Sequence, residues 1–321
     1  MPLELPKEKW AGRIGEVVVG ALESEGGTRT RKIVLGGVTS LPFLSFEGEY
    51  PNEPVIGMEI FDVVREDYPE VVKKPFEDVI DDPAKWAKKC VEEYGADMIC
   101  LKLIGTNPEE EDRSVEEAEQ TVKEVMKAVG VPLMIYGSGH EEKDAKVMEM
   151  ASNATKGERC LLGAAEEDNY KSISVASMAN DHALVAFSNL DINLAKQMNI
   201  LLTDFGVKLE NIVMDPLQAG LGYGLEYSYS VIERIRLAAL MGDKILQVPI
   251  LCATSRMWNA REAFKEDASL GDSNSRAIFW EATTGLSALM AGADALVMRH
   301  PAAVKYVRES VKKLYERGGE G

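Results

Sequence analysis

Short apolar runs alternate with longer stretches of helical character through most of this chain of 321 residues. Each run is mainly apolar and does not alternate, which is typical of parallel strands that are buried on both faces of a sheet. The stretches between the runs place charged and apolar side chains at helical spacing. We count eight runs, at residues 55–61, 98–103, 132–136, 160–163, 184–187, 211–214, 248–252 and 295–298.

The stretches between the runs carry recognisable helix ends. Asp82 and Pro83 begin one helix and Gly95 ends it, because proline suits the first helical turn and glycine the C-terminal end. Ser114 and Glu117 form the pattern of a capping box at the start of the next helix. The predicted helices span residues 84–94, 115–130, 141–154, 169–180, 192–205, 228–241 and 275–290.

One tripeptide occurs at two of the helix-to-strand junctions. Gly-Ala-Asp stands at residues 95–97 and again at 292–294, each time immediately before an apolar run. The echo suggests a repeated unit of one strand and one helix.

Eight such units predict a TIM (β/α)8 barrel formed by residues 55–321, since about 250 residues is the usual size of that fold. A doubly wound open sheet is the alternative architecture. Residues 1–54 are expected to form an N-terminal extension packed on the barrel. Within it, strand-like segments at 16–22 and 30–35 flank Gly26 and Gly27, which predicts a β-hairpin.

The charge balance excludes some classes of partner. The chain has 36 Lys and Arg against 53 Asp and Glu, a formal charge of −17, which argues against binding to nucleic acid or to an anionic membrane. No apolar run approaches the roughly 18 residues that span a bilayer. The first ten residues lack the apolar core of a secretion signal, so a cytoplasmic protein is expected.

The residues that most often bind metals are sparse and scattered. The chain has three histidines and no H-E-x-x-H motif, and its cysteines form no C-x-x-C pair. This spacing is typical of neither a zinc site nor an iron–sulfur centre, so no metal site is predicted on this chain. Buried free thiols are expected at Cys90, Cys100, Cys160 and Cys252.

Function in a TIM barrel is carried by the loops that follow the C-terminal ends of the strands. Those loops contain polar side chains and glycines here, but no catalytic triad or nucleophile elbow, and no catalytic residue is assigned. Glu59 and Asp62 stand within and after the first strand. The candidate binding residues are Ser138, His140, Asn189, Asp191, Asn193, Asp215, Gln218, Gly220, Gly222, Tyr223, Gly224, Thr254, Arg256 and Arg299.

Each group of candidates has a functional and a structural interpretation. Asn189, Asp191 and Asn193 alternate, so a strand-like extension would place them on one side, where amide-type hydrogen bonds could hold a ligand. Capping of a helix by Asp191 and a turn at Asp215 are the structural alternatives. The glycines at 220–224 either let backbone amides approach a ligand or form a flexible turn.

The stretch at residues 214–236, MDPLQAGLGYGLEYSYSVIERIR, resembles the signature of the small subunit of the corrinoid iron–sulfur protein. The archaeal counterpart of that subunit is the delta subunit of the acetyl-CoA decarbonylase/synthase complex. The resemblance continues at residues 41–62, 136–144, 158–171 and 191–199, and so runs over nearly the whole chain.

The resemblance implies a TIM barrel and a role in the reductive acetyl-CoA (Wood–Ljungdahl) pathway. The family forms a heterodimer whose cobalamin accepts a methyl group from methyltetrahydrofolate, with the help of a separate methyltransferase. The methyl group then passes to acetyl-CoA synthase/CO dehydrogenase. The resemblance further implies that the large subunit holds the [4Fe–4S] cluster and the main corrinoid-binding domain. The mouth of the small subunit's barrel would cover the shared cobalamin, and this chain alone would not be a catalyst.

Two other functions remain open at this point. A free-standing methyltetrahydrofolate-dependent corrinoid methyltransferase on the same barrel would hold the pterin ring with Asn189, Asp191 and Asp215. A barrel that serves assembly alone would tolerate substitutions of these residues.

Overall fold

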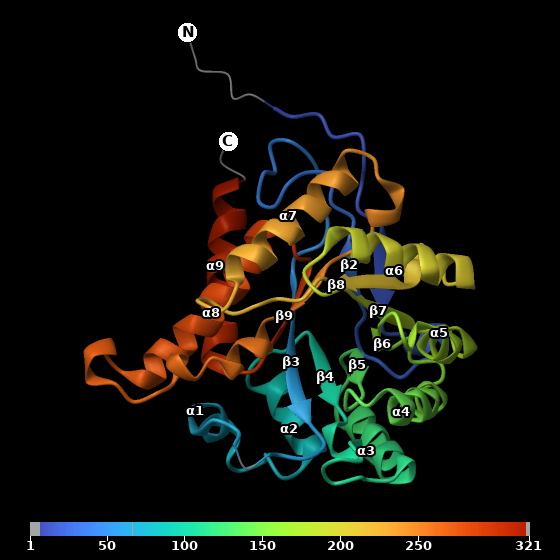
Figure 1. Ribbon diagram of the computed structural model, residues 1–321, viewed down its shortest axis with the longest axis vertical. Coiled ribbons are helices and arrows are strands. Elements are labelled where there is room, and N and C mark those ends of the chain that lie inside the picture. Colours follow the sequence, from blue (N-terminus) through green and yellow to red (C-terminus); the bar gives the residue numbers. More distant parts are fainter. Residues whose placement is uncertain (1–6, 66, 319–321) are drawn as a thin grey trace.

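Eight parallel strands form a barrel at the centre of the computed structural model, which describes residues 7–65 and 67–318 (Figure 1). Their order is β8-β7-β6-β5-β4-β3-β10-β9. The ring closes where the N–H of Met214 in β8 donates to the carbonyl of Pro249, just before β9, at 2.9 Å. The predicted TIM barrel is therefore confirmed, and the open sheet is wrong. The barrel strands are β3 (Val55–Phe61), β4 (Met98–Lys102), β5 (Leu133–Tyr136), β6 (Leu161–Ala165), β7 (Ala183–Phe187), β8 (Ile212–Asp215), β9 (Leu251–Ala253) and β10 (Ala295–Met298).

Helices surround the strands as an outer layer (Figure 1). The first and the last helix were not predicted from the sequence, although Pro301 stands at a helix start. The other seven agree with the predicted helices to within three residues at either end, the usual uncertainty of helix ends. The helices are α1 (Glu70–Lys73), α2 (Pro83–Glu92), α3 (Val115–Ala128), α4 (Glu141–Ala154), α5 (Tyr170–Ala179), α6 (Ile192–Phe205), α7 (Leu225–Leu240), α8 (Ser273–Ala291) and α9 (Pro301–Gly318).

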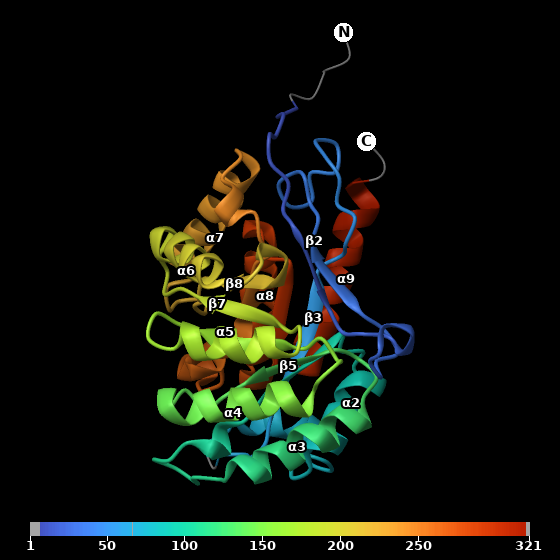
Figure 2. The same ribbon diagram turned by 90° about the vertical axis from the view of Figure 1, so that its right-hand side faces the viewer.

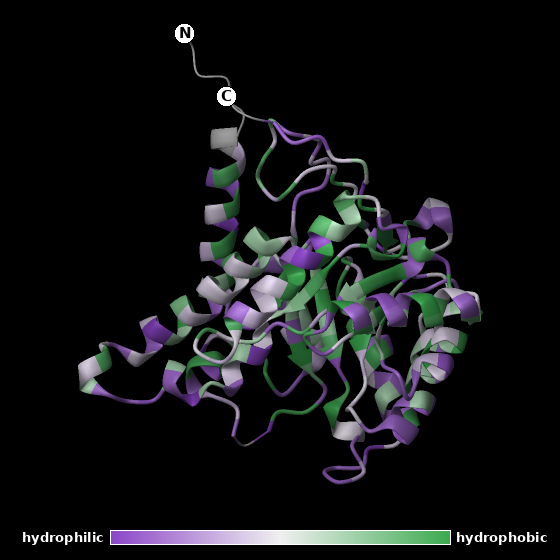
Figure 3. Cartoon of the chain, turned by 45° about the horizontal axis from the view of Figure 1, so that its top comes forward, coloured by the Kyte–Doolittle hydropathy of each residue, from purple (hydrophilic) through white to green (hydrophobic). Residues whose placement is uncertain are grey.

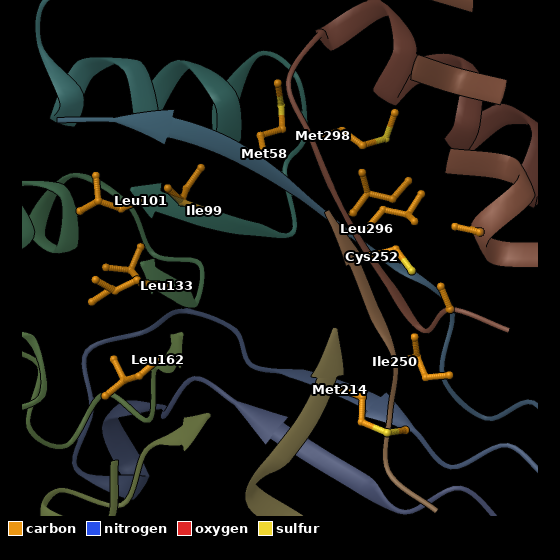
Figure 4. Close-up of a cluster of buried hydrophobic side chains, with 14 of the residues drawn as sticks. Met58, Ile99, Leu101, Leu133, Leu162, Met214, Ile250, Cys252, Leu296 and Met298 are labelled. Atoms are coloured by element: carbon orange, nitrogen blue, oxygen red, sulfur yellow. The ribbon is translucent and has the colours of Figure 1, made fainter. Parts of the chain in front are cut away.

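The barrel strands are buried on both faces, which explains their continuous apolar runs. In β4, Met98 and Cys100 belong to the cluster that includes the barrel interior, whereas Ile99 and Leu101 belong to the cluster under the helices. Figure 4 draws part of this outer cluster, in which Leu101 lies in a row with leucines of the neighbouring strands. Apolar residues accordingly gather at the strands and polar residues on the outer helix faces (Figure 3).

The predicted N-terminal hairpin is present outside the ring of helices (Figure 2). Its antiparallel strands, β1 (Glu16–Val19) and β2 (Ile33–Gly36), are shorter than predicted, because the chain leaves the extended conformation at Gly20 with φ +93°. Apolar hairpin side chains, among them Val17 and Leu35, join the interior cluster of the barrel. The division of the chain into units at residue 54 stays a prediction.

The two Gly-Ala-Asp tripeptides make the same contacts. Asp97 donates its N–H to the carbonyl of Ile56 at 2.9 Å and accepts the N–H of Ile56 on Oδ2 at 3.0 Å. Asp294 contacts Ile250 in the same two ways, at 2.7 and 2.8 Å. Each aspartate thus joins the start of its own strand to the start of the preceding neighbour in the barrel. The sequence echo marks a repeated structural junction.

Within residues 7–65 and 67–318, we find no helix that combines the length and the apolar character needed to cross a membrane.

Candidate functional site

A buried carboxylate lies at the centre of the barrel mouth, by which we mean the C-terminal ends of β3–β10 and the loops that follow them. Glu59 of β3 accepts hydrogen bonds from Arg299 Nε at 2.7 Å and Ser255 Oγ at 2.7 Å, and Lys102 Nζ lies 2.8 Å away. Burial alone would raise the pKa of Glu59, but the charges of Arg299 and Lys102 lower it to about 2. The group therefore stays ionised and holds two cations in place.

Arg299, which follows β10, is fixed on several sides. Its guanidinium lies 5.1 Å from the centre of the Phe61 ring and 5.5 Å from that of Tyr68, distances typical of cation–π contacts. The backbone N–H of Arg299 donates to buried Glu281 at 2.6 Å. Burial raises the pKa of Glu281 to about 7, against the lowering effect of its backbone hydrogen bonds. Arg299 is thereby held rigid at the mouth.

A second ion pair lies on the other side of the mouth. The fully buried carboxylate of Asp215, at the end of β8, accepts two hydrogen bonds from Arg256 Nη1, at 3.0 and 3.2 Å. The guanidinium of Arg256 also lies 5.2 Å from the centre of the Phe187 ring. Asp215 is therefore more than the turn residue that the sequence allowed, since it anchors a cation from another loop.

Between these two ion clusters the mouth contains a cavity of about 450 Å³, which we call the mouth cavity. Lys102 and Arg256 line it together with carboxylates that follow β6, notably Glu166. Burial raises the pKa of Glu166, and the nearby charge of Arg256 opposes that shift. Two cations therefore share the cavity with acidic groups, so its polar lining has both signs of charge.

Polar groups without partners face this region. Tyr136, at the end of β5, lines the mouth cavity, and its buried hydroxyl has no hydrogen-bond partner among the described residues. The buried hydroxyl of Ser188, directly after β7, likewise lacks a partner within the described chain. Such groups are unusual in folded proteins, because an unmet buried hydrogen bond is unfavourable. Both hydroxyls therefore keep unused hydrogen-bonding capacity next to the mouth.

The predicted residues after β5 form a closed turn. Asp144 accepts the N–H of Ser138 at 2.8 Å, its hydroxyl at 3.0 Å, and the N–H of Gly139 at 2.7 Å. The amides that an anionic ligand would need are thus occupied by a protein carboxylate. His140 caps α4, since its Nδ1 accepts the N–H of Lys143 at 3.4 Å. Ser138 lines the mouth cavity.

The strand-like extension predicted for residues 189–193 is wrong. The chain turns at Leu190, where φ is +51°, and α6 begins at Ile192. Asp191 is the N-cap of that helix and accepts the N–H of Asn193 at 2.6 Å. Asn189 and Asn193 are exposed, and neither lines the mouth cavity. Alternation in the sequence did not place the three side chains on one face, because a helix cap intervenes.

Replacement of Asp191 by alanine is expected to lower the free energy of unfolding by about 1 kcal/mol, the usual effect of losing an N-cap. Asp191→Ser keeps an oxygen that can cap α6, so it should retain most of that stability. Urea unfolding of both variants checks the prediction. Equal losses for serine and alanine would contradict the capping role.

The predicted residues after β8 pack mainly against the protein itself. Gly222 and Gly224 adopt φ of +74° and +97°, which glycine allows most readily. A side chain on Gly220 would begin only 3.0 Å from Met257 Cβ, so this turn needs glycine for packing. Tyr223 is exposed and its hydroxyl contacts Glu262.

The two remaining predicted residues are buried. Gln218 donates from Nε2 to the carbonyl of Ala219 at 2.7 Å, while its Oε1 has no partner among the described residues. Thr254 donates to the carbonyl of Val297 at 3.0 Å, which is a structural role.

Of the predicted site residues, Ser138 and Arg256 line the mouth cavity, and Asp215 contacts it indirectly through its ion pair with Arg256. Sequence reasoning missed Lys102, Tyr136 and Glu166. Lys102 and Tyr136 are polar residues at the ends of apolar runs, which is the signal that could have found them. Glu166 lies one residue beyond β6 and satisfies the same strand-end rule.

All four cysteines are buried and free, as predicted. Burial raises the pKa of each thiol, including that of Cys100 to about 12, so the protonated form dominates at neutral pH. In the described part of the chain, no group of three or more His, Cys, Asp or Glu side chains is arranged to hold a metal ion.

Comparison with known proteins gives a consistent set of relatives. Residues 16–307 match a protein family described as the CO dehydrogenase/acetyl-CoA synthase delta subunit. The acetyl-CoA decarbonylase/synthase complex subunit delta of Methanothermobacter thermautotrophicus is 41% identical over 305 residues, covering 95% of this chain and 76% of the relative. The corresponding subunit of Methanocaldococcus jannaschii is 40% identical over 318 residues, covering 99% of this chain and 78% of the relative.

Solved structures with a similar fold include dihydropteroate synthases. The enzyme of Coxiella burnetii, in complex with pteroic acid, aligns with a TM-score of 0.59 at 14% identity over 88% of this chain and 99% of its own. The enzyme of Thermus thermophilus, in complex with 4-aminobenzoate, aligns with a TM-score of 0.56 at 18% identity over 86% of this chain and 99% of its own. At such low identity these alignments support the barrel fold alone.

Proposed function

The chain belongs to the CO dehydrogenase/acetyl-CoA synthase delta subunit family, and from that membership we propose that it is the small subunit of a corrinoid iron–sulfur methyl carrier. In this proposal a larger partner subunit holds the [4Fe–4S] cluster and most of the corrinoid contacts. A separate methyltransferase delivers methyl groups from methyltetrahydrofolate, and acetyl-CoA synthase/CO dehydrogenase receives them. The match to the family over residues 16–307 is the observation that carries the proposal.

The residues of the mouth fit a corrinoid that lies over them. A corrin ring with its amide arms is larger than the ligands that cavities of about 300–1,000 Å³ enclose. The mouth cavity, at about 450 Å³, would therefore face one side of the ring and receive only part of it. The unpartnered hydroxyls of Tyr136 and Ser188 suit the peripheral amides of a corrin, which both donate and accept hydrogen bonds.

When bound, the corrinoid supplies the cobalt that carries the methyl group. The part of this chain is to exclude water and to hold the ring in position. Arg256 is kept in place by Asp215 and Phe187, and Arg299 by Glu59 and two aromatic rings, so the rim of the mouth is preorganised before any ligand arrives. A rigid rim shields a reactive centre without the loss of side-chain freedom on binding.

Anaerobic purification of the complex from its source is the experiment that tests the subunit role. We expect the chain to copurify with a larger partner in equal amounts, and iron, sulfide and corrinoid absorption to accompany that pair. A chain that purifies as a monomer without cobalt would contradict the proposal. If the chain alone bound methyltetrahydrofolate and methylated free cob(I)alamin, it would instead be a free-standing methyltransferase.

A mouth substitution tests whether the barrel touches the corrinoid or serves assembly alone. Tyr136→Phe removes the unpartnered hydroxyl of a residue that lines the mouth cavity, so we expect a changed visible circular dichroism spectrum of the corrinoid and faster reoxidation of reduced cobalt in the complex. Tyr227→Phe, at a tyrosine that is 65% exposed on α7, is the matched control and should leave both readouts unchanged. Identical spectra and rates for the two variants would support the assembly role.

A further inference from the structure

A second cavity, of about 620 Å³, opens beside the mouth cavity and shares Lys102 and Ile104 with it. Four of its described lining side chains are cationic, of which Arg65 is paired with Glu110, and one, Asp67, is anionic. The excess of positive charge is notable in a chain whose formal charge is −17. We call it the cationic cavity.

The guanidinium of Arg299 is held with its outer nitrogens unused. Its Nε donates to Glu59 at 2.7 Å, and the rings of Phe61 and Tyr68 restrict its plane. None of the residues that the structure describes accepts a hydrogen bond from either Nη atom of Arg299, which lines the cationic cavity. A fixed guanidinium fork with two free N–H edges matches the oxygens of a carboxylate or phosphate.

The charges around Glu59 leave one positive charge unbalanced. Lys102 and Arg299 both pair with this single carboxylate, whose side chain is fully buried. Glu281 also lies against Arg299, and its two oxygens accept the backbone N–H groups of Arg299 and His300, at 2.6 and 2.9 Å. Burial raises the pKa of Glu281 to about 7, so this carboxyl group is only partly ionised at neutral pH and balances the charge only in part. A surplus charge at a mostly buried site is unfavourable unless an anion accompanies it. The cluster therefore favours an anionic ligand.

Aromatic rings supply the rest of the wall. Phe61 and Tyr68 line the cationic cavity on the side of Arg299, and Trp258 and Phe264 line it from the segment that follows β9. The rings of Trp258 and Phe264 lie 6.2 Å apart at an angle of 31°. Phe61 and Tyr68 each turn one face to the guanidinium of Arg299. Trp258 stacks on His300 at 6.2 Å, so it is the remaining apolar surface of these rings that favours a flat, weakly polar ligand body. Arg261, exposed at the same cavity, adds a cation that a second anionic oxygen can reach.

We propose that the cationic cavity binds a small molecule in which a carboxylate or phosphate group is joined to an aromatic body. Arg299 and Lys102 would contact the anionic group, and the aromatic side chains would contact the flat body. This inference does not depend on the corrinoid role, because it uses residues of this chain alone.

Isothermal titration calorimetry of the full chain in low-salt, phosphate-free buffer tests the proposal. The probes are phenyl phosphate and benzoate, with uncharged benzamide and inorganic phosphate as matched controls. We expect saturable one-to-one binding of at least one aromatic anion, at least about 10-fold tighter than benzamide and tighter than inorganic phosphate. The comparison of phenyl phosphate with benzoate identifies which anionic group the cavity prefers.

Two variants link the binding to the cavity. Arg299→Lys keeps the charge but loses the fork, so we expect an affinity about 10-fold lower, with circular dichroism to verify folding. Arg261→Ala changes an exposed residue that cannot disturb the core, and we expect an affinity about threefold lower. Arg234→Ala, at an exposed arginine on α7, is the control and should have no effect. Equal affinity for phenyl phosphate and benzamide, no saturable binding of either anion, or an unchanged affinity in Arg261→Ala would overturn the proposal.

Discussion

The Glu59→Gln variant is expected to be less stable than the native chain by about 3–5 kcal/mol. Glutamine has nearly the same shape as glutamate, so the loss comes from the charge and from the one accepting oxygen that becomes a donating NH2 group. Without the carboxylate, the side chains of Lys102 and Arg299 remain at the mouth, 21% and 14% exposed, with no anion between them. Removing one partner of a buried ion cluster has this large an effect because the remaining charges are desolvated and unpaired. Urea unfolding at pH 7 measures it.

The same carboxylate predicts how that difference depends on pH. The pKa of Glu59 is about 2 in the folded chain, below its ordinary value of 4.5, so the folded state binds the proton less readily than the unfolded state. The stabilisation is therefore complete above about pH 5 and is lost as the pH falls from about 4.5 toward 2. This lowering of the pKa of Glu59 corresponds to about 3 kcal/mol in the free energy of unfolding. The difference in stability between the native chain and Glu59→Gln should shrink over that interval.

An exposed ion pair provides the control. Glu119 pairs with Lys123 across one turn of α3, and both side chains are more than a third exposed, so Glu119→Gln should change the stability by no more than about 0.5 kcal/mol. If Glu59→Gln were as mild as this control, or if its effect were independent of pH between 5 and 3, the buried cluster would not be a stabilising element.

The fold could be predicted because its signal is local. Eight runs that are apolar on both faces predict a parallel sheet buried on both sides, and the alternation of Met98 and Ile99 between the two clusters shows that one side is the barrel interior and the other the helical layer. The repeat of Gly-Ala-Asp also had a local cause, since each aspartate joins the start of its own strand to the start of the preceding strand in the same way. The last helix was missed although Pro301 marks its start.

The site could be predicted only in part. The strand-end rule identified Arg256 and Arg299 as residues of the mouth. It could not predict that their partners are Asp215 and Glu59, because these contacts join residues 41 and 240 positions apart in the chain. At residues 189–193 the strand-like extension was wrong, since Asp191 is the N-cap of a helix and the neighbouring asparagines are exposed, and a role of these residues in binding stays a prediction. Short polar side chains at strand ends can cap a helix or bind a ligand equally well, and only the three-dimensional contacts distinguish these two roles.

The two equivalent aspartates permit a matched comparison that isolates burial. Asp294 pairs with Arg236 at 2.7 Å, and the side chain of this arginine is fully buried. Asp97 makes the same strand contacts but pairs at 2.7 Å with Arg308, whose side chain is 37% exposed. We expect Asp294→Ala to lower the free energy of unfolding by about 3–5 kcal/mol, since it leaves a buried guanidinium without its carboxylate.

Asp97→Ala removes the corresponding hydrogen bond to a backbone N–H and two ion pairs that water screens, one with Arg308 and a longer one with Arg31 at 3.5 Å. We therefore expect it to lower the stability by only about 1–2 kcal/mol. Urea unfolding of both variants measures the two losses of stability, provided that the free energy of unfolding depends on urea concentration with the same slope in both. Because the backbone contacts of the two aspartates are equivalent, the difference between the variants reports the buried pair with Arg236 against the exposed pairs with Arg308 and Arg31. Equal losses would show that the strand junction, and not the buried charge, determines the stability at both ends of the repeat.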